Sequence, residues 1–493
     1  MSAREPALVR HSLGLAASHC LSRLLLLLRA AASAAALGPG GFGTWNALNL
    51  ILDFGGYASI GALQGLELEL PPAASRRDEE RSRRIMSAAW GMVVIGAAAF
   101  GAIVVAVLGM RRGGMLVTWG YGPPLLMVAA AWLQLAFQYH ASCLKAHGDF
   151  DTVSAAQSVQ AAIGAGLGLA LVWRTGVWGL LGGWLVGSAA GLAWLWRSPH
   201  RVPFRPRGVA HGGALVRLGL PIFAVFALSQ VLRSLDRIAF VRLAPAERLG
   251  HYSLGLLAAG LVLYLPESAA MVLYPRIASA SQGARDPVRT RDEVIRTHRA
   301  LGVLVPAVVG LGMVWAAPLT GWLLPEFREG VDALYRLSIG ALMLSSATVP
   351  AYFLLASGAA RPLLATLAGV TLSSAALVFS VAARDPRPAS VAVAASLGYA
   401  VFALAVIALA SRRLFDRGVE RARFALAGLA PAIVAAALAL AACHVGPRES
   451  LRAALLRSAA FVLAYLPLAI AFGRGLGLTD PVRAAWRRFA KGS

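Results

Sequence analysis

Lysine, cysteine and long polar stretches are scarce in this sequence. Of its 46 Lys and Arg residues only Lys145 and Lys491 are lysine, and its 23 Asp and Glu residues leave a net charge of +23. No polar domain could present this charge to a nucleic acid, so we expect no nucleic-acid partner. The three cysteines, Cys20, Cys143 and Cys443, are far apart and lie in or beside apolar runs. This distribution excludes a disulfide framework and favours packing.

Motifs of catalysis are also missing. The sequence has no phosphate-binding loop with lysine, no metal-ligand spacing and no nucleophile motif. Gly164, Gly166 and Gly168 imitate a nucleotide-binding loop, but no strand accompanies them, so close helix packing is the better interpretation. Every connection expected outside the membrane is too short for a catalytic domain. We therefore expect that the protein is not an enzyme and needs no cofactor or metal.

Long apolar runs dominate what is present. Hydrophobic residues make up 58% of the 493 residues, and charged residues only 14%. Apolar runs of this kind, separated by short arginine-rich connections, indicate an all-α polytopic membrane protein. We predict about fourteen transmembrane helices, at about 11–37, 42–66, 85–109, 120–143, 152–173, 177–196, 214–243, 250–274, 298–319, 334–358, 362–383, 389–410, 424–445 and 451–472.

The distribution of arginine predicts the orientation of the chain. With the N-terminus in the cytoplasm, the cytoplasmic segments hold roughly three times as many basic residues as the outside segments, as the positive-inside rule requires. We therefore predict that Ser75–Arg84, Arg197–His211 and Arg276–Arg299 are cytoplasmic. An even number of spans places the C-terminus inside as well. The first apolar run lacks a small-residue cleavage site, so we expect it to be retained as a helix.

The second half of the chain resembles the first. The segment LGPGGFGTW around Gly43 matches LAPAERLGHY around Gly250, with one inserted residue, and both follow similar leucine-rich runs. Six spans separate the two turns, so both halves enter the membrane in the same sense and should be related by an axis along the membrane normal. We predict a six-helix bundle in 1–207, a second in 208–411, and two additional helices with a basic cytoplasmic tail in 412–493.

Three segments resemble a known family. They are LGPGGFGTWNALNLILDFGGYASIGA, SLDRIAFVRLAPAERLGHYSLGLLAAGLVLYLPESAAMVLYPRI and LLPEFREGVDALYRLSIGALM. They are similar to the polysaccharide-biosynthesis flippases, the O-antigen-type members of the multidrug/oligosaccharidyl-lipid/polysaccharide exporter superfamily. The resemblance covers most of the first twelve spans. It implies two six-helix bundles in a V around a central cavity, plus two extra C-terminal helices.

The resemblance also implies a function. Such a protein moves an undecaprenyl-diphosphate-linked oligosaccharide from the inner to the outer leaflet of the bacterial cytoplasmic membrane, for O-antigen, lipopolysaccharide or exopolysaccharide synthesis. Its partners would be this lipid-linked oligosaccharide, membrane lipids and a polysaccharide polymerase or chain-length protein, and we expect a monomer. A lipid II flippase is an alternative, although its aspartate-alanine-phenylalanine and proline-asparagine-x-x-arginine signatures are missing near the second span. A proton- or sodium-coupled drug exporter of the superfamily is another, although those usually have twelve spans.

Six charged residues lie inside predicted spans and are candidates for binding substrate in a central cavity. Each charge in hydrocarbon costs about 2.5–3.5 kcal/mol on insertion scales, so these side chains should face water or each other. Arginine suits a diphosphate because its fork can donate two parallel hydrogen bonds. The six candidates are Arg23, Arg29, Asp53, Arg233, Asp236 and Arg237.

Each candidate also has a structural alternative. Arg23 and Arg29 could pair with Asp53 or reach the interface, and Arg233 could pair with its neighbours in the seventh span. Arg237 lies close enough to the outer interface to snorkel. Asp53 and Glu267 are candidates for ion coupling, but Glu267 follows Pro266 and could merely cap a kink. Polar side chains of the fourth span could bind sugars or bond between helices: Gln134, Gln138 and His140.

Overall fold

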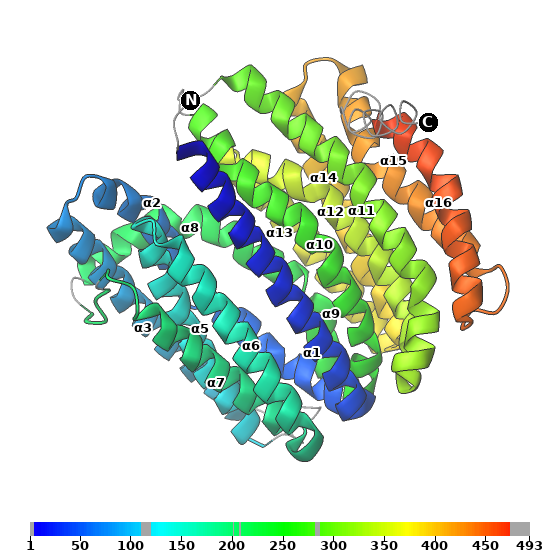
Figure 1. Ribbon diagram of the computed structural model, residues 1–493, viewed down its shortest axis with the longest axis horizontal. Helices are drawn as coiled ribbons and strands as arrows, with labels where there is room; N and C mark the ends of the chain where they lie inside the picture. The colour runs from blue at the N-terminus through cyan, green and yellow to red at the C-terminus, as the bar shows by residue number, and fades with distance from the viewer. Residues whose placement is uncertain (1–3, 110–119, 201, 207–208, 282–285, 474–493) are drawn as a thin grey trace, which may run out of the picture. The chain divides into compact units, whose positions relative to one another are not determined.

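The computed structural model describes residues 4–109, 120–200, 202–206, 209–281 and 286–473, with the side chains of residues 4–28 outside the description. Throughout these ranges the regular structure is helical (Figure 1). The elements are α1 (Arg4–Gly55), α2 (Ala62–Ser75), α3 (Glu79–Gly109), α5 (Gly122–Ala146), α6 (Phe150–Thr175), α7 (Val177–Leu195), α8 (Val209–Leu232), α9 (Leu235–Leu243), α10 (Ala246–Ser281), α11 (Pro287–Leu323), the 3-10 helix η1 (Pro325–Gly330), α12 (Val331–Ala356), α13 (Ala360–Arg384), α14 (Pro388–Leu414), α15 (Gly418–Cys443) and α16 (Leu451–Gly473).

Most of these helices are built to cross a membrane. Within the described ranges, 11 helices are long and apolar enough to do so. The other three predicted spans are the first, on α1, the second, which is divided between the end of α1 and α2, and the fourth, on α5. The hydropathy of α5 is lowered by Gln134, Gln138 and His140. The all-α polytopic class is therefore confirmed. The predicted connection 276–299 is mostly helical, because α10 and α11 both continue beyond their apolar runs.

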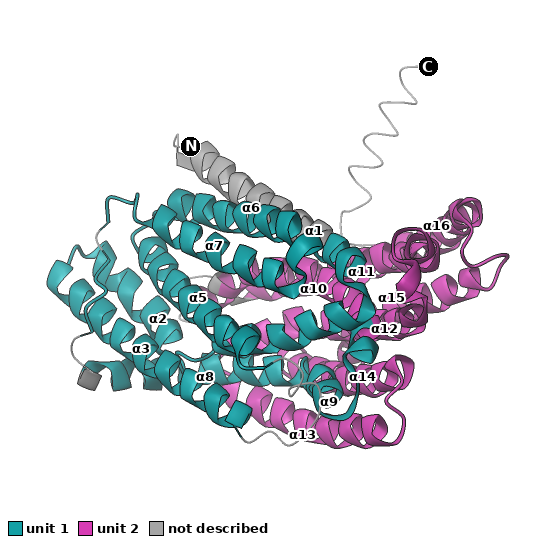
Figure 2. Cartoon of the chain, turned by 90° about the horizontal axis from the view of Figure 1, so that it is seen from below, with its two compact units in different colours: residues 1–250 teal, residues 251–493 magenta. Residues whose placement is uncertain are grey.

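The chain forms two compact units, residues 1–250 and 251–493 (Figure 2). Unit 1 contains the helices from α1 to α9 and the first residues of α10, and unit 2 contains the remainder. The boundary follows the seventh predicted span, whereas the sequence analysis divides the bundles before that span. The division into two six-helix bundles therefore stays a prediction.

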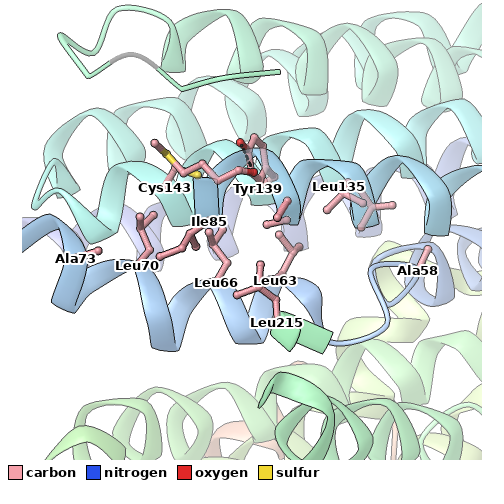
Figure 3. Close-up of a cluster of buried hydrophobic side chains, with 14 residues drawn as sticks. Ala58, Leu63, Leu66, Leu70, Ala73, Ile85, Leu135, Tyr139, Cys143 and Leu215 are labelled. Carbon is pink, nitrogen blue, oxygen red and sulfur yellow. Dashed lines mark hydrogen bonds between the residues drawn. The ribbon is translucent and has the colours of Figure 1, made fainter. Parts of the chain in front are cut away.

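An apolar cluster forms one core of unit 1 (Figure 3). Leu66 and Leu70 of α2 pack with Ile85 of α3, with Leu135 and Tyr139 of α5, and with α8. The hydroxyl of Tyr139 donates to the carbonyl of Met86 at 3.1 Å and to that of Pro203 at 2.7 Å. A buried hydroxyl needs such partners. Here they fasten the connection after α7 to the core.

The two turns matched in the sequence lie in contact within unit 1. A Cβ at Gly43 would overlap the carbonyl of Ala246, and a Cβ at Gly250 would overlap the carbonyl of Pro39. The contact is reciprocal, because each segment places a glycine against the residue four positions before the other glycine. Only glycine permits two backbones to approach this closely. A local twofold relation has this form, although the predicted axis between complete halves stays a prediction.

Unit 2 packs its last two helices against α11. Gly302 of α11 faces Ala427 of α15, where a Cβ would lie 2.5 Å from a carbonyl oxygen. From α16 the Tyr465 hydroxyl donates to the Val303 carbonyl at 2.9 Å, and Ser458 accepts from the indole of Trp315 at 2.9 Å. The two additional C-terminal helices are therefore held by α11 through both small residues and hydrogen bonds.

Candidate functional site

Two predicted spans of unit 1 are broken helices. The second span consists of the end of α1 and of α2, with a turn between Gly55 and Gly61. Ile60 has a φ of 48° and Gly61 a φ of 89°, so the chain leaves the helical conformation there. The seventh span is interrupted between α8 and α9, at Arg233 and Ser234. Broken helices expose backbone groups at membrane depth, which is tolerated where they are buried in protein or line a cavity.

Glycines bring the two broken spans together. A Cβ at Gly65 of α2 would lie 2.1 Å from the carbonyl oxygen of Leu215 in α8. A Cβ at Gly219 of α8 would lie 2.0 Å from the carbonyl oxygen of Gly61. The helices can meet at this distance only because no side chain intervenes. The two breaks are therefore held by a close helix crossing.

An ion pair joins the two broken spans. Nη1 of Arg237, in the first turn of α9, lies 2.8 Å from Oδ2 of Asp53, in the last turn of α1. The Arg237 side chain is 13% exposed and that of Asp53 is 36% exposed. Nη2 of Arg237 also donates to Oγ of Ser234 at 3.1 Å. From the sequence, Arg23 or Arg29 of the first span was the expected partner of Asp53 if these charges paired. In the structure its partner is Arg237.

Asp236 and Arg233 flank the same break. Asp236 is 1% exposed, and its Oδ1 accepts a hydrogen bond from the backbone nitrogen of Arg237 at 2.7 Å. An acidic side chain in this position stabilises the start of α9, because it satisfies an amide and complements the helix dipole. Arg233 is half-buried at the break, and both residues make further contacts. The structure therefore pairs Arg237 with Asp53 and places Ser234 and Asp236 against Arg237.

Arg29 is enclosed by aromatic rings. It is 8% exposed, and its guanidinium carbon lies 4.9 Å from the ring centroid of Trp184 and 5.6 Å from that of Trp45. Cation–π contacts of this kind stabilise a desolvated guanidinium. Among the described residues, Nη1 of Arg29 has no hydrogen-bond partner. The N–H groups of Nη1 are therefore not used by the described part of the chain.

The remaining predicted residues are placed differently. Arg23 lies on α1, but its side chain is outside the described part of the chain. Glu267 is half-buried on α10, in unit 2, and makes contacts of its own. Gln134 accepts from Nε2 of Gln160 at 2.7 Å, and the same amide donates to Ser188 at 3.1 Å. Gln134 therefore bonds between helices.

Sequence reasoning missed four residues of these sites. Trp45 and Trp184 enclose Arg29, Ser234 holds Arg237, and Gln160 binds Gln134. Trp45 stands in the matched turn segment and Ser234 directly follows Arg233, so position along the chain offered a signal for these two. For Trp184 and Gln160 only the three-dimensional packing shows the contact.

In the part of the chain that the structure describes, the site presents arginine donors rather than a metal constellation. In the described ranges, no group of three His, Cys, Asp or Glu residues could bind a metal ion. Arg237 is held by a carboxylate that is partly accessible, and Arg29 retains an unused donor. Both features suit a phosphate, which binds arginine through charge-assisted, often bidentate hydrogen bonds.

Comparison with known families gives one match. The family described as "Polysaccharide biosynthesis protein" matches residues 8–281, more than half of the chain. This match confirms the resemblance seen in the sequence. No protein of curated function matches the chain.

Several solved structures share the fold. A lipid II flippase MurJ in an inward closed conformation superposes with a TM-score of 0.69 at 16% identity, covering 94% of this chain and 99% of its own. A multidrug resistance MATE family transporter of the MOP superfamily, in an inward-facing conformation, gives a TM-score of 0.60 at 15% identity, covering 80% and 94%. The Vibrio cholerae MATE transporter VcmN in its bent form gives 0.57 at 14% identity, covering 84% and 97%. At these identities the likeness concerns the fold.

Proposed function

Because this chain belongs to the polysaccharide biosynthesis protein family, we propose that it is a flippase for an undecaprenyl-diphosphate-linked oligosaccharide. It carries this cargo from the inner to the outer leaflet of a bacterial cytoplasmic membrane for surface polysaccharide synthesis. The cargo has a diphosphate, a large polar glycan and a long isoprenoid tail. Its passage needs cations for the phosphates at a depth where charges are otherwise costly.

The Asp53–Arg237 ion pair is the observation that carries the proposal. It joins two broken helices, at 2.8 Å, in a unit made of apolar spans. Removing one partner of a buried pair is costly, so an arriving anion must replace Asp53 at the guanidinium while it still compensates the charge. A diphosphate meets this requirement. Arg29, whose Nη1 has no hydrogen-bond partner among the described residues, supplies a second donor for the same headgroup.

The other charged residues have supporting roles in this proposal. Arg23 and Arg233 add positive charge on the first and seventh spans, and Asp236 orients Arg237 through its backbone amide. Asp53, once released from Arg237, can take up a proton or a cation and so couple transport to an ion gradient. Glu267 is a second candidate for this coupling, on α10 of unit 2.

The experiment that tests this function is deletion in the native organism, followed by assignment of the lipid-linked sugar to a leaflet. We expect the undecaprenyl-linked oligosaccharide to accumulate where an impermeant glycan-modifying enzyme cannot reach it in spheroplasts. Arg29→Ala should fail to restore access. The matched control is Arg84→Ala, which removes an exposed arginine of α3. This variant should restore access of the enzyme to the glycan. Normal access after deletion would contradict the proposal, and loss of small-molecule efflux alone would favour an exporter.

The proposed direction of transport requires a defined orientation. Single cysteines in Ser75–Arg84, Arg197–His211 and Arg276–Arg299, in a background without the native cysteines, should resist an impermeant thiol reagent in intact cells. Permeabilisation should then expose them. Labelling of all three segments in intact cells would reverse the orientation and with it the proposed direction.

A further inference from the structure

Three connections of unit 1 meet around a cavity of about 830 Å³, which we call the loop pocket. The connections are α2–α3, α5–α6 and α7–α8. They contribute Arg77, His147 and His200, together with Glu79 and Arg83 at the start of α3. Three segments far apart in the sequence therefore place basic side chains around one space.

Arg77 is the unneutralised cation of the loop pocket. It sits in the α2–α3 turn with a φ of 56°, a conformation that L residues rarely adopt. Strained residues of this kind concentrate at functional sites. No carboxylate of the described ranges pairs with Arg77, whereas Arg83 lies 3.2 Å from Glu79. The turn therefore presents one cation whose charge is not compensated.

Two histidines add donors beside this cation. The rings of His147 and His200 lie 4.9 Å apart at an angle of 30°. Nδ1 of His147 is 2.8 Å from the carbonyl of Cys143, so Nδ1 carries a hydrogen and Nε2 is the ring atom left for a ligand.

Hydrogen bonds hold His200 in position. Its backbone nitrogen donates to Oγ of Ser198 at 3.2 Å, and this hydroxyl donates to Oδ2 of Asp149 at 2.6 Å. Oδ1 of Asp149 accepts from the backbone nitrogen of Thr152 at 3.2 Å and caps α6. Burial would raise the pKa of Asp149, but the bonds from Ser198 and Thr152 and the nearby His200 lower it below its ordinary value. Both carboxylate oxygens of Asp149 therefore accept hydrogen bonds from residues of the α5–α6 and α7–α8 segments.

A neighbouring cavity of unit 1 is lined differently. This second cavity, of about 650 Å³, is bordered by α2, α3 and α8. Its basic residues have acidic partners: Arg81 lies 3.4 Å and His211 3.8 Å from Glu69, and Arg84 lies 3.6 Å from Glu80. Arg83 lines both cavities and lies near Glu79, so each arginine of the second cavity has a carboxylate close by, whereas Arg77 of the loop pocket has none in the described ranges.

Aromatic residues place the loop pocket at the level of a membrane surface. Trp196, at the end of α7, is 64% exposed, and Phe150, at the start of α6, is 48% exposed. The guanidinium of Arg197 lies 3.7 Å from the ring centroid of Trp194. Exposed tryptophan and arginine at helix ends are typical of the lipid headgroup region. The loop pocket therefore lies at a depth that lipid headgroups reach.

We propose that the loop pocket binds the phosphate group of a lipid headgroup through Arg77, His147 and His200. Basic pockets between membrane helices bind such headgroups. The phosphate can belong to a glycerophospholipid or to a polyprenyl diphosphate, since both offer the same acceptor oxygens. This site shares no residue with the Asp53–Arg237 pair. It rests on the proposed function only where the phosphate belongs to a polyprenyl diphosphate.

Native mass spectrometry of the purified full-length protein tests the proposal. Micelles containing phosphatidylglycerol or phosphatidylcholine are the probes, and sodium pyrophosphate is the competitor. Arg77→Gln and the pair His147→Gln/His200→Gln should each weaken phosphatidylglycerol binding by about tenfold, because a hydrogen bond to a charged group is lost. Arg84→Gln, the same loss of charge beside the second cavity, should bind as the wild type. Arg77→Lys, which keeps the charge, should retain part of the affinity.

The outcomes separate the two sources of phosphate. Displacement of phosphatidylglycerol by pyrophosphate supports a site for the diphosphate headgroup, and resistance to pyrophosphate supports a glycerophospholipid. Equal binding by wild type, Arg77→Gln and the histidine pair would overturn the proposal. An equal loss in Arg84→Gln would also overturn it, because it would show a diffuse charge effect. Since the measurement involves no transport, its failure leaves the flippase proposal untouched.

Discussion

Arg29 in unit 1 and Arg457 in unit 2 are both buried on apolar helices, but they meet their hydrogen-bonding needs differently. Arg457 is 3% exposed, and its donors reach the carbonyls of Val445, Gly446, Pro447 and Arg448 in the α15–α16 turn. Arg29 is 8% exposed, lies against two tryptophan rings and keeps an unused Nη1.

The difference separates a structural arginine from a candidate ligand-binding one. Arg457 closes a turn, and four of its five N–H donors bond to the carbonyls of that turn. Arg29 is stabilised by aromatic faces, which leave its planar fork partly unoccupied. Burial and charge are therefore poor guides to function on their own. The number of donors that the chain itself satisfies is the better guide.

The largest expected effect concerns Arg457. Arg457→Ala should lower the free energy of unfolding by about 3 kcal/mol, because the four hydrogen bonds from the guanidinium that tie the α15–α16 turn to α16 are lost. Thermal unfolding of the purified protein measures this change. Arg452→Ala, an exposed arginine one turn earlier on α16, is the control and should leave stability unchanged. Equal stability of the two variants would show that Arg457 does not stabilise the fold.

Arg29→Ala should have the opposite profile. We expect surface polysaccharide to fall by about a hundredfold at matched protein levels, with thermal stability close to that of the wild type, because the missing bonds are those to the substrate. Arg29→Lys should retain partial export, since it keeps the charge but loses the fork. If Arg29→Ala instead loses stability and exports normally per folded molecule, Arg29 is structural like Arg457.

A smaller effect is expected at Asp149, whose carboxylate is fully engaged within unit 1. Asp149→Ala should lower stability by about 1 kcal/mol at neutral pH through loss of the α6 cap. The pKa of Asp149 is lowered in the folded protein, so its stabilisation is present above the ordinary carboxyl pKa and is lost as the pH falls through the lowered value. The gap between variant and wild type should therefore close in acid. A gap that is constant with pH would exclude the carboxylate as its cause.

The class of fold was predictable from the sequence, because the length of an apolar run can be read directly from the residues of that run and indicates a membrane-spanning helix. It also marked Asp53 and Arg237 as candidates for one cavity, because charges in such runs are expected to face each other or water; the structure pairs these two side chains, and their role in binding stays a prediction. The identity of the partner was not predictable, because it depends on where the close crossing at Gly65 and Gly219 places the two spans. A one-dimensional pattern gives depth along a span but not the angle at which spans cross.

The helix breaks were also beyond the reach of the sequence. The run 214–243 is continuously apolar apart from its charges, and nothing in its periodicity marks an interruption at Arg233 and Ser234. The break is stabilised by Asp236, which takes the Arg237 amide, and by Ser234, which takes its guanidinium. Such side-chain to backbone bonds compete with the helix only in a folded context.

The most direct test of the central claim is a double-mutant comparison of the Asp53–Arg237 pair. Surface polysaccharide is measured at matched protein levels for Asp53→Leu, Arg237→Leu and the double variant. If Arg237 binds the diphosphate, the double variant should be as inactive as Arg237→Leu alone, although it should be more stable than either single variant because no lone charge remains buried. Full export by the double variant would show that the pair is only structural and would contradict the account.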